Sequence, residues 1–327
     1  LGADGREYSL RSIDKDPSVS LPPALRETVA RDIVQDQIAS IHPYGAFAIP
    51  PLARAAGVYH TEPRLVFVPD DPRLGVFRET FGNQLMMFEL RPDEDMSDYP
   101  NVGSSEDVVS VEKMYEEIEE DNDNRIDVEA FVRARLFDML LSDWDRHKNQ
   151  WLWAEFDDSD GQGKLYRPVP KDRDWAFNRF DGVLPTLVRI GFDPKFQPFE
   201  DDFGNLKGLT LNGLPQDRRL AGPADRSVWI EQAAVIQTAL TDAVIEAGIA
   251  ALPQAVIDFH GPALVETLKK RRDRLPAAAE AFYRIASRRV DLFGSLKHEQ
   301  FEVNRIDNET TETVSYTHLT LPTNREV

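Results

Sequence analysis

The chain has 327 residues, 41% of them hydrophobic, which suffices for one large or two moderate globular domains with a substantial core. Its formal net charge of −19 excludes a protein that coats nucleic acid or an anionic membrane surface, and no apolar run is long enough to cross a bilayer. Cysteine is absent, which excludes disulfides, thiolate metal sites and cysteine nucleophiles together.

A strand pattern begins the chain. Residues 6–13 alternate in polarity, which predicts a strand with Tyr8 and Leu10 on one face and Arg11 on the other. Lys15 follows at the end of this strand. The first predicted strand therefore carries one cation, and a second cation lies just beyond it.

A helix pattern follows at residues 24–41. Leu25, Val29 and Ile33 recur at intervals of four, which predicts an amphipathic helix. Asp36 lies on or beside this apolar stripe rather than opposite it. Two interpretations remain open for Asp36, namely an acid with a specific partner and a solvated helix edge.

The middle of the chain alternates short strands and helices. Composition and periodicity predict a short helical piece at residues 52–56 and apolar strands at residues 64–68 and 84–90. An acidic region at residues 104–127 follows, and its part from 108 to 118 is predicted to be helical. This helix leads toward the most apolar helix of the chain.

A dense polar cluster ends that apolar helix. Residues 131–141 have helical apolar spacing, and a run of charged and amide side chains interrupts it. An unpaired charge between apolar segments is expensive to bury. The cluster must therefore either form a structural network of paired charges or serve chemistry; its members include Asp143, Asp145, Arg146, His147, Asn149 and Gln150.

A predicted hairpin separates this cluster from a second one. Residues 151–156 and 165–169 have strand patterns, and the Asp- and Gly-rich segment between them is typical of a turn. The second cluster begins directly after the hairpin with Lys171, Asp172 and Asp174. The two polar clusters therefore flank one hairpin.

The C-terminal part is predicted to be mostly helical from residue 227 to 293, with Pro253, Pro262 and Pro276 as breaks. A basic run at residues 269–272 favours a solvated helix face, with contact to an anionic partner as the alternative. Strand-like alternation returns at residues 300–313. Residues 314–327 resemble the translation of a sequencing adapter and are left out of the fold prediction; we expect the chain to be a piece of a longer protein.

Both polar clusters resemble motifs of atypical kinases. In phosphatidylinositol kinases and HipA-type kinases, a hydrophobic helix leads into Asp-Arg-His-x-x-Asn, and a metal-binding Asp follows the next hairpin. Here Asp145-Arg146-His147 precedes Gln150, and the hairpin leads to Asp172. The resemblance implies a two-lobed α+β, protein-kinase-like fold, with a small mixed N-lobe and a larger, mainly helical C-lobe. It also implies ATP and Mg2+ as cofactors.

The resemblance also implies residue roles. The catalytic loop comprises Asp145, Arg146 and His147, with Asp145 orienting or deprotonating the acceptor hydroxyl. Four residues with amide or carboxylate oxygens are implied to bind magnesium: Gln150, Asn149, Asp172 and Asp174. Four N-lobe residues are implied to bind the nucleotide or to support its binding: Arg11, Lys15, Asp36 and Glu89. Gln150 replaces the usual Asn and Arg11 the usual Lys, but a Gln carbonyl can ligate magnesium and Arg can clamp phosphate.

The implied domains are a partial N-lobe at residues 1–95, a C-lobe at 96–294 and the start of a following β segment at 295–313, with the adapter-like tail at 314–327. The motif Trp-Asp-Arg-His-x-x-Gln-Trp further resembles one in uncharacterised bacterial envelope proteins. Some of these proteins carry a calcineurin-like phosphoesterase or an outer-membrane surface-antigen domain. This second resemblance implies a cell-envelope setting, with further domains of a longer chain as partners.

Two alternatives to a phosphotransferase of unknown acceptor remain open. One is a catalytically inactive kinase-like module of a larger envelope protein. The other is a metal-dependent phosphohydrolase, because one set of side chains has the chemistry of a metal site: Asp143, Asp145, His147, Asp172 and Asp174.

Overall fold

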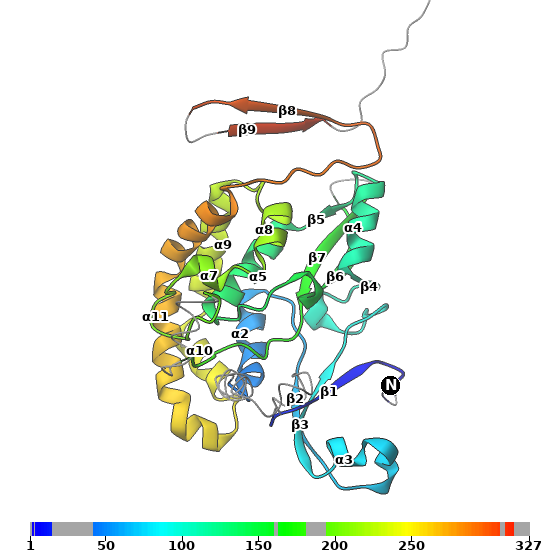
Figure 1. The fold of residues 1–327 in the computed structure, drawn as a ribbon, viewed down its shortest axis with the longest axis vertical. Coiled ribbons are helices and arrows are strands. Elements are labelled where there is room, and N and C mark those ends of the chain that lie inside the picture. Colours follow the sequence, from blue (N-terminus) through cyan, green and yellow to red (C-terminus); the bar gives the residue numbers. More distant parts are fainter. Residues whose placement is uncertain are drawn as a thin grey trace, which may run out of the picture.

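The computed structural model of the chain describes residue 2 and residues 4–14, 42–159, 163–180, 194–307 and 311–316. The helix expected at residues 24–41, together with Lys15 and Asp36, lies outside these residues. Figure 1 shows a body of helices beside a four-stranded sheet, with a three-stranded sheet at one end. The predicted α+β class is confirmed.

The small sheet is antiparallel and has the strand order β1-β3-β2. It comprises β1 (Tyr8–Ser12), β2 (Arg64–Val68) and β3 (Gln84–Leu90), which agree with the predicted strands within two residues. Its register sets residue 11 opposite residue 87 and residue 9 opposite residue 89. Because side chains alternate between the faces of a sheet, Arg11 and Glu89 share one face.

Short helical elements connect these strands. The 3-10 helix η4 (Pro72–Phe77) and helix α3 (Arg78–Phe81) lie between β2 and β3. The 3-10 helix η3 (Gly45–Ala48) leads into α2 (Ile49–Ala56), which ends at Gly57 in the left-handed region with φ 67°. Although α2 falls within the range expected for the N-lobe, it packs against helices α5, α9 and α10 of the large body.

The larger sheet has the order β4-β6-β7-β5, with β5 and β7 parallel and the other pairs antiparallel. Its hairpin is β6 (Trp151–Asp157) and β7 (Lys164–Pro170), as the sequence predicted. The edge strands are β4 (Asp107–Ser110) and the two-residue β5 (Arg125–Ile126). The hairpin therefore lies in the middle of the sheet, where it positions the segments on both sides of it.

The helix expected to begin at residue 108 begins three residues later, so this part of the prediction is wrong. Val108 and Val109 pair with β6 and are buried, which places them in β4. Helix α4 (Val111–Glu120) begins after Ser110, whose side chain accepts the backbone N–H of Lys113 at 3.2 Å. The short 3-10 helix η5 (Pro100–Val102) precedes the strand.

Helix α5 (Val128–Leu140) forms the centre of the core. Its N-cap Asp127 accepts the backbone N–H of Ala130 at 2.9 Å. Phe131 packs against Trp151 and Trp153 of β6, with ring centroids 5.3 and 6.0 Å apart. Most residues of α5 are buried all round, which is typical of a helix enclosed by other elements.

The remaining helices build the large body, and α11 runs along α9 and α10 (Figure 1). They are α7 (Leu206–Leu209), α8 (Leu214–Leu220), α9 (Arg226–Ala239), α10 (Asp242–Ile249) and α11 (Gln254–Ala286). No helix within the described residues has the length and apolar character needed to span a membrane.

The prediction that Pro262 and Pro276 break the C-terminal helix is wrong, because both lie inside α11. Of the three prolines, only Pro253 lies at a helix boundary, as the N-cap with which α11 begins. An internal proline costs a helix about 3 kcal/mol. Burial of apolar side chains on the inner face, such as Leu268 and Leu275, contributes about 1.5–3 kcal/mol each and offsets this cost.

The basic run at residues 269–272 is not a solvated face with unpaired charges. Arg271 has no exposed side-chain surface. The other three side chains form ion pairs within the chain: Lys269 with Glu246, Lys270 with Asp201 and Arg272 with Asp242. Each charge of the run therefore has a partner within the chain, and the three paired side chains lie on the partly solvated face of the helix.

A two-stranded hairpin, β8 (Gln300–Arg305) and β9 (Thr311–Tyr316), extends from the body (Figure 1). It matches the strand pattern of residues 300–313, and β9 continues three residues into the adapter-like range. The preceding segment is held to the body by Arg219, whose guanidinium carbon lies 3.7 Å from the ring centroid of Tyr115 and 4.1 Å from that of Phe293.

Candidate active site

Helix α5 ends in a tight turn, and the first polar cluster lies in the loop that follows it. Ser142 is in the left-handed region with φ 57°. Its N–H donates to the carbonyl of Met139 at 3.1 Å, and the N–H of Asp143 donates to the carbonyl of Asp138 at 2.9 Å. These paired bonds form a Schellman cap, which stops the helix at Leu141.

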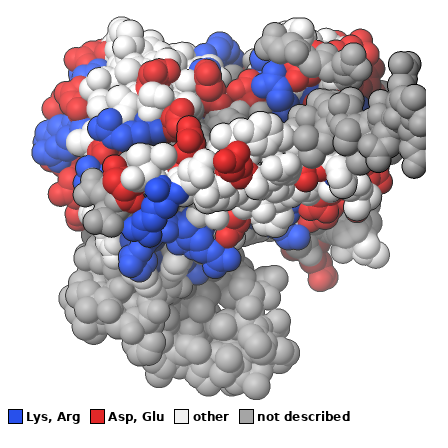
Figure 2. All heavy atoms as spheres, turned by 90° about the horizontal axis from the view of Figure 1, so that it is seen from above, with Lys and Arg blue, Asp and Glu red and all other residues white. Residues whose placement is uncertain are grey.

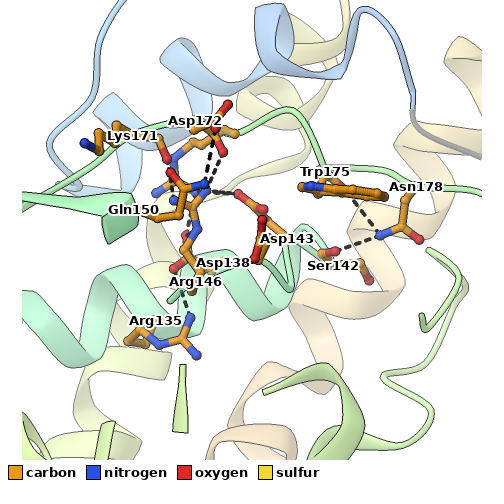
Figure 3. A network of polar contacts seen from close by, with 12 residues as sticks. Arg135, Asp138, Ser142, Asp143, Arg146, Gln150, Lys171, Asp172, Trp175 and Asn178 are labelled. Atoms are coloured by element: carbon orange, nitrogen blue, oxygen red, sulfur yellow. Dashed lines mark hydrogen bonds and ion pairs between the residues drawn. The ribbon is translucent and has the colours of Figure 1, made fainter. Parts of the chain in front are cut away.

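A buried network of charges lies directly beneath this loop (Figure 3). The guanidinium of Arg146 pairs with Asp143 and lies 3.4 Å from Asp138. Arg173 from the second polar cluster also pairs with Asp138, at 2.7 Å. The network joins three arginines and three aspartates: Arg135, Arg146, Arg173, Asp138, Asp143 and Asp217. For these side chains, the interpretation as a structural network is correct.

Electrostatics within the network favour the charged form of Arg146. Burial by itself would lower the pKa of Arg146, but the carboxylates of Asp143 and Asp138 outweigh burial and hold that pKa above its usual range. Burial likewise acts on Asp143 and raises its pKa to about 7, against the opposing effect of Arg146. Burial therefore favours the neutral form of Asp143, whereas the neighbouring carboxylates keep Arg146 charged.

Arg146 also joins the two polar clusters through the backbone. Its guanidinium donates to the carbonyl of Lys171 and, at 3.3 Å, to the carbonyl of Asp172. The N–H of Lys171 in turn donates to the carbonyl of Gln150 at 3.1 Å. Arg146 is thus the buried anchor that holds the loop after α5 against the segment after β7.

The side chain of Asp172 lies where this segment meets the small sheet. Asp172 is in the left-handed region with φ 57°, a conformation that aspartate adopts more readily than most residues. Its Oδ1 forms an ion pair with Arg11 of β1, and its Oδ2 accepts a hydrogen bond from Nε2 of Gln150 at 3.2 Å. A residue of the small sheet and a residue of the loop after α5 therefore converge on one carboxylate.

Glu89 is a second acid that pairs with Arg11. Its Oε2 pairs with Arg11, and its Oε1 accepts a hydrogen bond from the hydroxyl of Thr61. Burial would lower the pKa of Arg11, but Glu89 and Asp172 outweigh it and raise that pKa, with a further contribution from Asp174. Asp36, for which an acid with a specific partner was one interpretation, lies outside the described residues.

The predicted catalytic loop holds Asp145 close to His147, which caps the following 3-10 helix. Asp145 is 20% exposed, and its Oδ1 lies 3.9 Å from Nε2 of His147. His147 is the N-cap of the 3-10 helix η6 (Lys148–Gln150), since its Nδ1 accepts the N–H of Asn149 at 3.2 Å. Asn149 is exposed. Of the two adjacent amides, Gln150 is the one that contacts Asp172.

Gln150 and Asp172 have a spacing that fits magnesium. Two neighbouring ligands of an octahedral Mg2+, each about 2.1 Å from the metal, lie about 3 Å apart, and the two side chains are separated by 3.2 Å. Rotation of the Gln150 amide by a half-turn places its carbonyl oxygen where Nε2 now faces Asp172. Among the described residues, no three His, Asp or Glu side chains gather to hold a metal, but a site of one carboxylate, one amide and phosphate oxygens needs no such group.

Several site residues were missed by sequence reasoning. Arg135 and Asp138 are spaced i and i+3 within an otherwise apolar helix, and this spacing could have indicated a buried ion pair. Asn212, whose Nδ2 donates to Oδ1 of Asp145 at 2.9 Å, gave no signal because it lies in an ordinary Asn-Gly turn far along the chain. Thr61 likewise follows no motif.

No protein-family model and no curated protein matches the chain. Its fold is similar to the crystal structure of the proinflammatory kinase CtkA of Helicobacter pylori, with 12% identity, a TM-score of 0.39 and coverage of 88% of this chain and 92% of that chain. It is also similar to a structure of the Shewanella oneidensis toxin–antitoxin system HipA and HipB with operator DNA, with 14% identity, a TM-score of 0.34 and coverage of 76% of this chain and 58% of that chain. Both TM-scores are below 0.5, so the proposals below rest on the geometry of the site.

Proposed function

We propose that the chain is an ATP- and Mg2+-dependent phosphotransferase of the atypical kinase type, with an acceptor that its residues do not identify. The observation that carries the proposal is the contact of Arg11 with Asp172, next to Gln150. A phosphotransferase needs a cation on the phosphates and oxygen ligands for magnesium at one place. These three residues, from β1, from the loop after α5 and from the segment after β7, supply both.

Each residue has a distinct task in this proposal. Arg11 binds phosphate oxygens, and Glu89 holds its guanidinium in place. Asp172 and Gln150 hold magnesium, and Asp145 orients the acceptor hydroxyl or accepts its proton. Bound Mg–ATP supplies the phosphoryl group, and its metal neutralises charge that develops on the phosphates.

The ion pair between Arg11 and Asp172 makes nucleotide and metal depend on each other. Each of these two side chains currently neutralises the other. Arg11 has to release Asp172 to clamp phosphate, and Asp172 has to release Arg11 to ligate magnesium. Because binding of either ligand breaks the same ion pair and frees the group that the other ligand uses, we expect Mg2+ and ATP to bind with positive coupling.

The first prediction concerns thermal stability in the presence of Mg–ATP. Ligand at about 100 times its Kd stabilises a folded protein by about 2.7 kcal/mol, so we expect Mg–ATP to raise the melting temperature by several degrees. ATP with EDTA, or MgCl2 alone, should give a much smaller shift. Differential scanning fluorimetry measures each condition.

The Asp172→Ala variant should lose this shift, because it lacks the carboxylate proposed to hold magnesium. Asp157→Ala is a matched control, since Asp157 is exposed at the end of β6 and lies outside the proposed site. It should retain the full shift. An unchanged melting temperature of the wild-type chain at millimolar Mg–ATP would contradict the proposed function.

A catalytically inactive nucleotide-binding module is the second candidate, and Gln150 favours it, because this residue stands where the atypical-kinase motif has Asn. Phosphate transfer from γ-labelled ATP separates the two candidates. A kinase transfers phosphate, and Asp145→Asn abolishes transfer while the melting shift persists. An inactive module gives the shift without any transfer.

The phosphohydrolase alternative has less support. Asp143, one of its expected metal ligands, is fully buried and paired with Arg146. Hydrolysis of p-nitrophenyl phosphate that depends on His147 would favour this alternative over a kinase.

A further inference from the structure

The side chain of Asn212 lies against the carboxylate of Asp145. Its Nδ2 donates a hydrogen bond to Oδ1 of Asp145 at 2.9 Å, although the two residues are 67 positions apart in sequence. His147 also approaches this oxygen, but its Nε2 is 3.9 Å away, which is too far for a hydrogen bond. Of these two neighbours, Asn212 is the one that fixes the carboxylate.

The chemistry of the two groups determines the direction of this bond. An ionised carboxylate only accepts hydrogen bonds, so the amide nitrogen of Asn212, and not its carbonyl oxygen, must face Asp145. Fixing Oδ1 also restricts Oδ2, because both oxygens belong to one planar group. A general base must lie within about 3 Å of the proton that it accepts. Restricting the carboxylate of Asp145 therefore affects how well it can orient the acceptor hydroxyl or accept its proton.

Asn212 is held in place by a buried ion pair beneath its turn. The turn leads through Gly213 into α8, and Asp217 of α8 accepts two hydrogen bonds from Arg135, at 2.6 and 3.1 Å. A Cβ atom at Gly213 would lie 2.4 Å from a terminal nitrogen of Arg135. Since Arg135 is 3% exposed and held by this pair, it has no room to move away. Because Gly213 has no Cβ atom, the backbone of the turn can pack directly against the side chain of Arg135.

The same helix, α5, supports both partners. Arg135 of α5 anchors the turn that carries Asn212. Asp138 of α5 lies 3.4 Å from Arg146, which follows Asp145 directly. The backbone segments that carry Asn212 and Asp145 are thus both fixed to α5. Attachment to one rigid element gives side chains the positional accuracy that catalysis requires.

We propose that Asn212 is a positioning residue that orients the carboxylate of Asp145 for phosphate transfer. This inference rests on the proposed function. Asn212 contacts neither Arg11 nor Asp172 in the described structure, so it acts on the rate of transfer and leaves nucleotide binding unchanged.

The Asn212→Asp variant tests the proposal in the full chain. It keeps the size of the side chain but replaces the hydrogen-bond donor with a negatively charged acceptor beside Asp145. We expect kcat for transfer of γ-labelled phosphate from ATP, to water or to the protein itself, to fall about 100-fold, the effect of a misplaced reacting group. KM for ATP and the melting shift with Mg–ATP should remain within about twofold of wild type. Asn212→Ala, which removes the donor without adding charge, should lower kcat in the same direction.

Asn205→Asp is the matched control. Asn205 caps α7 by accepting the N–H of Gly208 at 3.2 Å, and aspartate caps a helix equally well, so neither rate nor stability should change. A wild-type kcat in Asn212→Asp, or loss of the folded state in both Asn212 variants, would overturn the positioning role and leave the proposed function intact. A wild-type chain that binds Mg–ATP without turnover would overturn both.

Discussion

The carboxylate of Asp143 is fully buried, and only one of its two oxygens is paired. Oδ2 contacts Arg146, whereas Oδ1 makes no hydrogen bond within the described residues. A buried oxygen without a partner is costly when it carries charge. This is the physical reason why burial raises the pKa of Asp143 to about 7 even beside an arginine.

The raised pKa of Asp143 predicts a specific pH dependence. In the unfolded chain this carboxyl titrates near 3.8, so between about pH 4 and pH 7 the folded state binds more protons than the unfolded state. Its contribution to stability is present at low pH and is lost as the pH rises through this window. Asp143→Asn cannot titrate there. Urea unfolding should therefore show the wild type losing stability relative to this variant from about pH 4 to about pH 7.

Asp157→Asn serves as the control for the loss of one carboxylate, because Asp157 lies at the exposed end of β6. A wild type that gains stability relative to Asp143→Asn over this window would contradict the assignment.

At the scale of single residues, the sequence predicted three of the site's side chains but missed two of the hydrogen-bond or ion-pair partners in the site. The motif order brought Arg11, Gln150 and Asp172 to attention, and the structure brings them together. It could not identify Glu89 as the acid beside Arg11, because that contact depends on the register of two strands. It could not find Asn212, because a polar residue in a turn has no periodicity.

Among the elements, a buried arginine of α11 reaches the end of α5. Arg271 of α11 donates to the carbonyls of Met139 and Leu140 at the end of α5, at 2.7 and 2.8 Å. It also donates to the carbonyls of Glu200 and Asp202. The last carbonyls of a helix have no intrahelical partner and carry partial negative charge, so a buried cation suits them. Arg271 thereby secures the helix end from which the candidate catalytic loop begins.

This contact predicts a large difference between neighbouring substitutions on α11. Arg271→Met should lower the free energy of unfolding by about 3–5 kcal/mol, because it leaves several buried carbonyls without donors. Lys270→Met removes only an exposed ion pair with Asp201 and should cost at most about 1 kcal/mol. Denaturant unfolding of both variants measures the two values. Similar values for the two would contradict the role of Arg271.

Prediction of the elements succeeded where the pattern was strong and local. The strands at residues 64–68 and 84–90 were predicted with their observed bounds. Strand β4 was merged into the following helix, because two valines fit both periods and only pairing with β6 decides between them. The helix breaks predicted at Pro262 and Pro276 are absent from α11, because tertiary packing outweighs the helix-breaking effect of a single proline.

For the whole molecule, the acidic excess is spread over a surface on which both signs occur. Figure 2 shows acidic and basic side chains interspersed on one face. Most exposed acids near a cation are already paired, and such pairs contribute about 0–1 kcal/mol each. The net charge of −19 therefore acts mainly as long-range repulsion within the folded state.

Salt should accordingly stabilise this chain. The Debye length falls from about 30 Å at 0.01 M to about 8 Å at 0.15 M, which screens the long-range repulsion more than it weakens close pairs. We expect the melting temperature to rise by a few degrees over this range, and equally with NaCl and KCl. A lower melting temperature at higher salt would mean that the surface ion pairs outweigh the repulsion.

The contact between Arg11 and Asp172 spans 161 positions of the chain. Synthesis at about 5–20 residues per second separates the emergence of these two residues by about 8–32 s. All three strands of the small sheet, including Glu89, leave the ribosome well before Asp172 does. The nascent chain can therefore form the pair between Arg11 and Glu89 first, and the large body then brings Asp172 to a cation that is already in place.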